Sequence, residues 1–66
     1  MKVVINDKPQ ETSAKTIAEL VKELGLNDQA AIAVAIGEQV IPRSAWATHP
    51  LTENVSVLII RAAQGG

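Results

Sequence analysis

The residues that could do chemistry in this chain stand at its end, where the sequence closes on Gly65 and Gly66. Glycine has no side chain and adopts backbone dihedrals closed to other residues, so a Gly-Gly terminus can enter a narrow channel. The terminal carboxylate of Gly66 is ionised at neutral pH and can attack the α-phosphate of ATP. The product would be an acyl-adenylate, which sulfur or amine nucleophiles can displace. The pattern therefore predicts a carboxylate that reacts inside another protein.

Side chains elsewhere offer no competing site. His49 is the only histidine, the chain has no cysteine, and the seven carboxylates are spread over turns and the expected helix. A zinc site or a nucleophile–base pair needs such groups to cluster, and a phosphate-binding loop needs a glycine-rich run. We therefore expect a protein that is not an enzyme and that binds no cofactor and no metal. The ATP chemistry would belong to a separate adenylating enzyme.

The tail by itself leaves two interpretations open. Two terminal glycines occur by chance in about 0.5% of chains at a glycine frequency near 7%, so an accidental Gly-Gly end is the alternative to a reactive tail. Residues 62–66 reach about 17 Å when extended, which would let a strand aim the carboxylate into a partner. We expect a folded domain over residues 1–61 and a flexible C-terminal tail over 62–66.

Composition limits the class of protein. The chain has 66 residues, 47% of them hydrophobic and 20% charged, which is typical of one small globular domain with one core. The net charge is −1 and there is no basic block, which argues against nucleic acid or an anionic membrane as partner. No apolar run approaches the roughly 20 residues of a membrane span. We expect a cytoplasmic protein that is monomeric when free.

The first half of the chain predicts a β-hairpin and a helix. Residues 2–6 are a short apolar run, residues 6–9 carry a turn signal, and residues 10–13 can return as the second strand. Thr16 is a suitable N-cap, with a glutamate three residues later as in a capping box, and Gly25 is placed to end the helix with a positive φ. Between them, apolar side chains fall at helical spacing on one stripe: Ile17, Leu20, Val21 and Leu24.

The second half predicts three more strands. Residues 31–36 alternate large and small side chains, which places the large ones on one face of a strand. A tight turn at Gly37 leads to residues 39–41, and Pro42 ends that strand because proline cannot donate to a ladder. Residues 43–54 are expected to be irregular, with a helical turn around Ser44-Ala45-Trp46. The last strand covers residues 55–61.

The order ββαβββ predicts an α+β fold, in which a mixed sheet carries one helix on one face. Because side chains alternate along a strand, Val4, Leu58 and Ile60 should point away from the face that the helix covers. We predict that these three form an exposed apolar patch that docks a partner. The alternative is that the loop carrying Trp46 covers them.

The segment from Ala33 to Trp46 resembles the signature of the ThiS family, the sulfur carriers of thiamin biosynthesis. Its most specific part is Val40-Ile41-Pro42-Arg43, followed by Trp46 three residues later. The resemblance extends over essentially the whole chain, and the Gly-Gly end is shared by all such carriers. Two positions depart from the family pattern. Gly37 stands where members usually carry Asn, and Asn54 stands alone where they often have Gly-Asp, which affects a turn.

This resemblance implies a ubiquitin-like β-grasp version of the α+β fold and a role as sulfur carrier in thiazole formation. An E1-like adenylating enzyme would use ATP to adenylate Gly66, and a sulfur donor would convert it to a thiocarboxylate. Thiazole synthase would then take the sulfur. Gly65 would be needed for entry into the channel. The matching positions Pro42, Arg43 and Trp46 would be structural.

Other functions remain in competition at this point. One is the small subunit of molybdopterin synthase, a sulfur carrier for the molybdenum cofactor, although such chains are typically longer, richer in aromatics and without the Trp46 segment. Another is a ubiquitin-like protein modifier joined to lysines through Gly66. The last is a β-grasp domain with an accidental tail.

Overall fold

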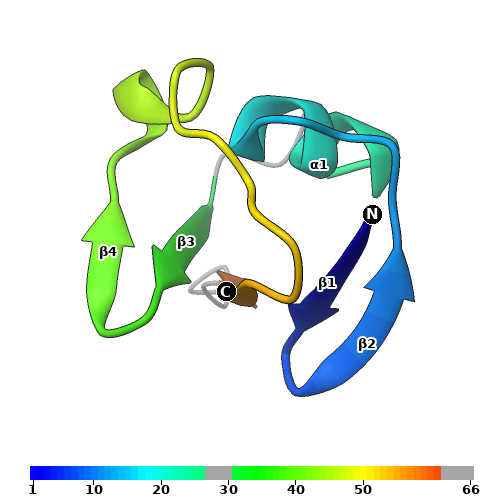
Figure 1. Ribbon diagram of the computed structural model, residues 1–66. Coiled ribbons are helices and arrows are strands. Elements are labelled where there is room, and N and C mark those ends of the chain that lie inside the picture. The colour runs from blue at the N-terminus through cyan, green and yellow to red at the C-terminus, as the bar shows by residue number, and fades with distance from the viewer. Residues whose placement is uncertain (27–30, 62–66) are drawn as a thin grey trace.

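The computed structural model describes residues 1–26 and 31–61, and in these ranges the elements follow the predicted order (Figure 1). The strands are β1 (Lys2–Ile5), β2 (Lys8–Glu11), β3 (Ile32–Ile36), β4 (Gln39–Ile41) and β5 (Ser56–Arg61), and the helices are α1 (Ile17–Glu23) and the 3-10 helix η1 (Arg43–Ala45). The five strands form one sheet in the order β2-β1-β5-β3-β4. The β1–β5 pair is parallel and the other pairs are antiparallel. The predicted α+β fold with a mixed sheet and one helix on one face is confirmed.

The first hairpin is tighter than the sequence predicted. Asn6 and Asp7 have φ values of 50° and 69°, and Ile5 pairs with Lys8 across them, so the turn uses only these two residues in the left-handed region. The second strand therefore begins at Lys8, and the prediction of a strand over residues 10–13 is wrong at both of its ends. Pro9 falls inside the strand. It is tolerated because β2 lies at the edge of the sheet.

Helix α1 begins and ends at the predicted signals. Thr16 Oγ1 accepts a hydrogen bond from the Glu19 amide at 3.3 Å. The Glu19 carboxylate in turn accepts from the Lys15 amide at 2.8 Å, one residue earlier than in a standard capping box. The helix ends at Glu23, and Gly25 has a φ of 75°. One face of the helix is fully buried, through Ile17, Leu20 and Val21.

Trp46 belongs to the core on the helix side of the sheet. Its side chain is 5% exposed, its Nε1–H donates to the Ile41 carbonyl at 2.9 Å, and the Arg43 guanidinium lies 4.5 Å from the centre of its ring. The Trp46 carbonyl also accepts from the Ala18 amide of α1 at 3.1 Å. The predicted structural role of Trp46 is therefore confirmed, and its loop packs toward the helix instead of covering the outer face of the sheet.

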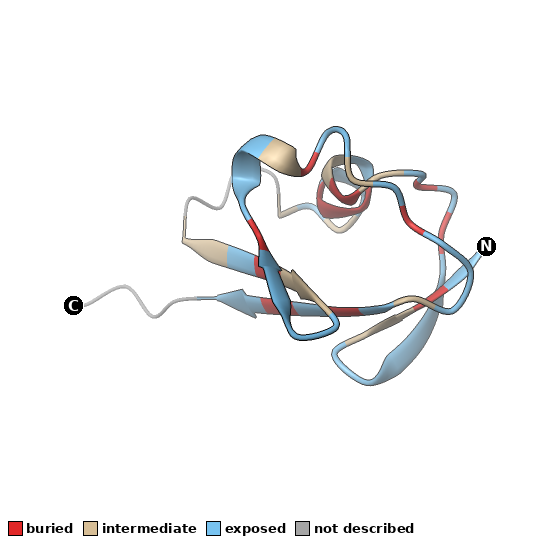
Figure 2. Cartoon of the chain, turned by 60° about the vertical axis from the view of Figure 1, so that its left-hand side comes forward, coloured by how far each residue is buried: buried red, intermediate tan, exposed pale blue. Residues whose placement is uncertain are grey.

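The core lies between α1 and the sheet and takes its buried strand side chains from β3, β4 and β5 (Figure 2). Its buried members are Ala14, Ile17, Leu20, Val21, Val34, Ile41, Trp46, Leu51, Val57 and Ile59. Val57 and Ile59 place β5 at the centre of this layer, while alternate residues of the same strand point to the other side. On the face that α1 does not cover, Leu58 and Ile60 are exposed to solvent.

Candidate functional site

The strand that leads to the predicted tail is the central strand of the sheet. β5 lies between β1 and β3, and its pairing with β3 runs without a break from Ile36↔Val57 to Ile32↔Arg61. Pairing with β3 therefore holds β5 as far as Arg61, its last described residue, and core packing holds it at Val57 and Ile59. Gly65 and Gly66 lie outside the described residues, so the predicted reactive group and channel-entry residue remain predictions.

The outer face of β5 carries large apolar side chains in solvent. Leu58 is 46% exposed and Ile60 is 51% exposed, in agreement with the expected alternation. On the neighbouring strand, Ala35 pairs with Leu58 and Ala33 pairs with Ile60. These alanines are small, so they leave the flanks of the two larger side chains open.

Val40 extends this surface onto the edge strand β4, and sequence reasoning missed it. It pairs with Ala35, so Val40, Ala35 and Leu58 form one row across three strands, and its side chain is 66% exposed. We call Val40, Leu58 and Ile60, with the two alanines between them, the outer patch. Strand alternation is the sequence signal that could have identified Val40. Because Ile41 points into the core, its neighbour Val40 must point to the opposite face.

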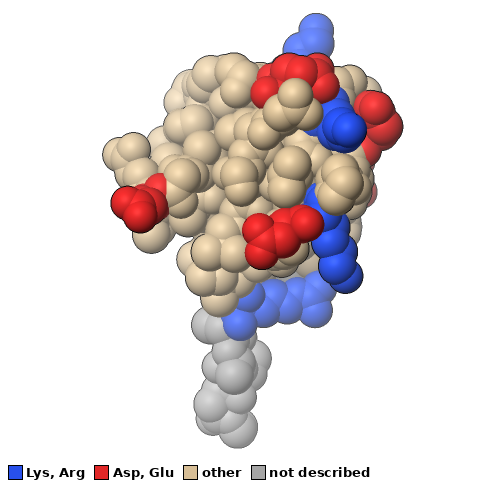
Figure 3. Space-filling model, turned by 60° about the horizontal axis from the view of Figure 1, so that its bottom comes forward, with Lys and Arg blue, Asp and Glu red and all other residues tan. Residues whose placement is uncertain are grey.

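Val4 contributes less to this face than predicted. Its partners are Pro9 on β2 and Ser56 on β5, and the side chain is half-buried between these strands. Much of this face is uncharged. One acidic side chain lies in its lower central part, and the other charged side chains lie toward its margins (Figure 3). Protein interfaces commonly combine an apolar centre with a polar border, so the outer patch is suited to docking another protein.

No second chemical site emerges in the described parts of the chain. His49 Nδ1 lies 3.1 Å from the Pro50 carbonyl oxygen, and residues 1–26 and 31–61 contain no cluster of three acidic or histidine side chains able to hold a metal. A hollow of about 510 Å³ opens beside the ends of β1, β5 and α1, lined by Ile5, Asn6, Leu24, Leu26, Ile59 and Arg61. This lining holds no nucleophile and no acid–base pair. Among the described helices, none is long and apolar enough to cross a membrane.

Comparison with known proteins supports a single family. Residues 3–66 match the model of the ThiS family. The chain is 33% identical to the sulfur carrier protein ThiS of Escherichia coli (strain K12) over 67 aligned positions that cover 100% of both chains.

Two solved structures have the same fold. The crystal structure of a thiamine biosynthesis protein (ThiS) from Geobacter metallireducens is similar with a TM-score of 0.83 and 20% identity, and the match covers 100% of both chains. An NMR solution structure of a thiamine biosynthesis protein from the same organism gives a TM-score of 0.79 at 20% identity, covering 100% of this chain and 88% of that one. At this identity the structural matches support the fold alone.

Proposed function

The chain belongs to the ThiS family, and on this premise we propose that it is a sulfur carrier in thiamin biosynthesis whose reactive group is the carboxylate of Gly66. The observation that carries the proposal is the extent of the family match, which runs through Gly65 to Gly66. The curated relative that is 33% identical over its full length is itself named a sulfur carrier. A carrier of this family is a substrate of other enzymes and not an enzyme.

In the proposed cycle this chain acts first as a nucleophile, through its carboxylate, and then passes the sulfur that it has received to thiazole synthase. A carboxylate oxygen of Gly66 attacks the α-phosphate of ATP in an adenylating enzyme, and pyrophosphate leaves. The outer sulfur of a persulfide on a donor then attacks the acyl carbon and AMP leaves, which gives an acyl disulfide between Gly66 and the donor. A second thiol attacks the donor's sulfur in this bond, so that the Gly66 thiocarboxylate leaves and the donor and that thiol are left as a disulfide. Thiazole synthase takes the sulfur, and Gly66 returns to a carboxylate. ATP and the sulfur donor are held by the partners.

Strand β5 would connect docking with delivery. Leu58 and Ile60 present the outer patch to solvent, and the same strand continues directly into the tail. We propose that the outer patch binds the adenylating enzyme, with Val4 at its border. A docked β5 would then point the following residues into the enzyme's site. Gly65 and Gly66 would pass a narrow channel because neither has a side chain. The division into a domain over residues 1–61 and a tail over residues 62–66 is part of this proposal.

The test is intact mass spectrometry of the chain after incubation with a thiamin-pathway adenylating enzyme, ATP and a persulfide donor. We expect a mass gain equal to the replacement of one oxygen by one sulfur, located at Gly66 by fragmentation. Deletion of Gly66 should abolish the gain. It should leave the melting temperature unchanged, because every core residue precedes Arg61.

The matched control for this test is Lys22→Ala, an exposed position on α1, and it should be thiocarboxylated like the wild type. Wild-type chain that gains no sulfur under these conditions would contradict the proposal. So would a Gly66 deletion that still gains it. A stable complex with a molybdopterin synthase large subunit, but none with thiazole synthase, would favour the molybdenum-cofactor alternative.

A further inference from the structure

The parallel pairing of β1 with β5 stops before β5 ends. The register joins Val4 to Ser56 and Ile5 to Val57, and the Asn6 amide donates to the Val57 carbonyl at 2.9 Å. The chain then turns away through Asn6 and Asp7 toward β2. No backbone of β1 is therefore left to pair with Ile59.

The side chain of Asn6 takes the place of that missing backbone. The Ile59 N–H donates to Asn6 Oδ1 at 2.8 Å, and Asn6 Nδ2 donates to the Ile59 carbonyl at 3.1 Å. One primary amide thus satisfies both polar groups that Ile59 directs toward β1, as a residue of a neighbouring strand would. We call this pair of hydrogen bonds the Asn6 clip.

Asparagine suits this position for two physical reasons. Its amide carries a donor and an acceptor on one short side chain, whereas an ionised aspartate only accepts. It also tolerates the left-handed backbone conformation, here a φ of 50°, better than most residues. The position needs both properties, because the same residue closes the tight turn and bonds Ile59.

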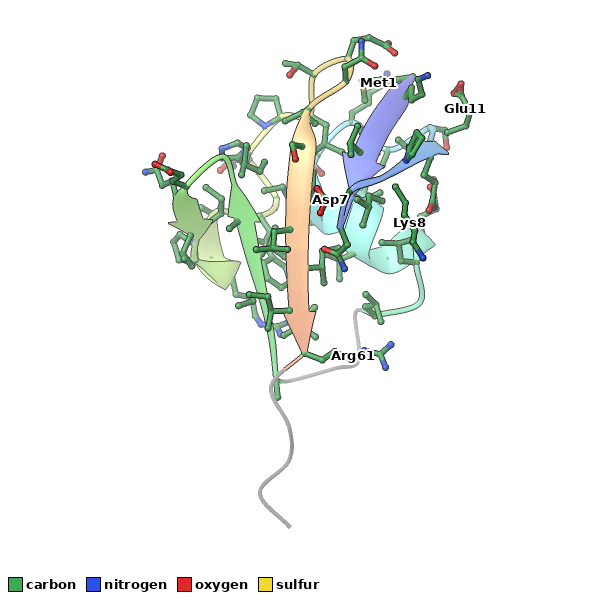
Figure 4. All side chains as sticks on the ribbon, turned by 90° about the horizontal axis from the view of Figure 1, so that it is seen from below. Met1, Asp7, Lys8, Glu11 and Arg61 are labelled. Atoms are coloured by element: carbon green, nitrogen blue, oxygen red, sulfur yellow. The ribbon has the colours of Figure 1, made fainter. Side chains whose placement is uncertain are left out.

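The clip holds the part of β5 from which the tail departs. Ile59 lies two positions before Arg61, which stands at the end of β5 (Figure 4). On its other side, β5 is paired with β3 up to Arg61. Without the clip, the strand beyond Val57 would keep the core packing of Ile59 but would be hydrogen-bonded on the β3 side alone.

We propose that Asn6 is a positioning residue for the Gly66 carboxylate: its side-chain amide anchors the end of β5 and so fixes the direction in which the tail leaves the domain. This inference rests on the proposed function of Gly66. A loosened strand end would spread the tail over more directions, and reactions that depend on placement lose rate when the reacting group is less well oriented. Docking should change less than delivery, because Val40 lies on β4 and because Leu58 and Ile60 keep their pairing with β3.

The experiment compares three variants of the full chain. Asn6→Gly keeps the left-handed turn and removes both hydrogen bonds. Asn6→Asp keeps the acceptor and points a carboxylate oxygen at the Ile59 carbonyl. Asp7→Gly is the matched control. Asp7 lies in the same turn with a φ of 69°, and both hydrogen bonds of the clip are made by Asn6.

The first readout is amide hydrogen exchange in the free protein, followed by NMR. With each net hydrogen bond worth about a factor of five, Asn6→Gly should speed exchange at Ile59 about 25-fold. The Ile60 amide is the internal reference, since alternate residues of a strand direct their hydrogen bonds to opposite sides. Asn6→Asp should speed Ile59 exchange as well, and Asp7→Gly should leave it within about twofold of the wild type. Unchanged exchange at Ile59 in Asn6→Gly would overturn the clip.

The second readout is the steady-state rate of Gly66 adenylation with the carrier as varied substrate. Asn6→Gly should lower kcat about tenfold and change KM less than about twofold, as expected for lost orientation. Asp7→Gly should match the wild type. A wild-type kcat in Asn6→Gly, together with faster Ile59 exchange, would overturn the positioning role. If the wild type itself is not adenylated, the proposed function fails instead, and the exchange data distinguish the two failures.

Discussion

The two faces of the sheet use the same kinds of side chain for opposite purposes. On the inner face, Val34 and Val57 are 1% exposed beneath α1. On the outer face, Leu58 and Ile60 are about half exposed. A two-layer domain gains stability only from the covered face, and the solvated face of such a sheet usually carries polar residues. Folding alone therefore does not account for the apolar outer face, and we propose that a partner covers it.

The largest effect expected from this comparison is on the inner face. Leu20 is fully buried, so Leu20→Ala should lower the free energy of unfolding by about 2–5 kcal/mol. Small domains have little stability to lose, so a large unfolded fraction is expected. Urea denaturation followed by circular dichroism measures the change. A loss below about 1 kcal/mol would show that α1 is not packed as described.

The second effect is on binding and tests the outer face. Leu58→Asp or Ile60→Asp should weaken binding to the adenylating enzyme at least tenfold, about 1.4 kcal/mol, while the free energy of unfolding changes by less than about 0.5 kcal/mol. Calorimetric titration measures the affinity for the adenylating enzyme, and urea denaturation measures the free energy of unfolding. Lys22→Ala changes the net charge by the same amount on the α1 layer and should bind like the wild type. Equal losses of stability and binding would place Leu58 or Ile60 in the core and remove the contrast between the faces.

The smallest effect concerns the extent of the outer patch. Val40 is the most exposed member at 66% but lies on the edge strand, where contacts weaken toward the border of an interface. Val40→Asp should weaken the same binding about threefold with no measurable change in stability. Binding at the wild-type level would confine the patch to β5. A loss larger than that of Leu58→Asp would move its centre to β4.

Much of the fold could be predicted because its signals are local. The N-cap Thr16, the positive φ at Gly25 and the turn at Gly37 all lie where the sequence placed them. The predicted start of the second strand is wrong because Asn6 and Asp7 complete the turn by themselves. Pro9, a turn signal in the sequence, lies inside β2, since an edge strand can accommodate proline. Asn54, which replaces the Gly-Asp pair common in the family before the last strand, also adopts a positive φ of 64°. It therefore supplies the left-handed residue that this turn requires.

The sequence alone determined the order of the elements, the two sides of β5 and the chemistry available to a Gly-Gly end, because each of these depends on residue types a few positions apart. It could not place Val40 beside Ala35 and Leu58. The alternation of side chains along a strand indicates the face on which a residue lies, but not which residues of the adjacent strands lie next to it. Nor could it join the Asn6 amide to Ile59, 53 positions away. Such pairings were decided by the tertiary structure, in which packing against α1 brings distant strands into one sheet. The shared core therefore sets both the strand register that gathers the outer patch and the support of the last strand.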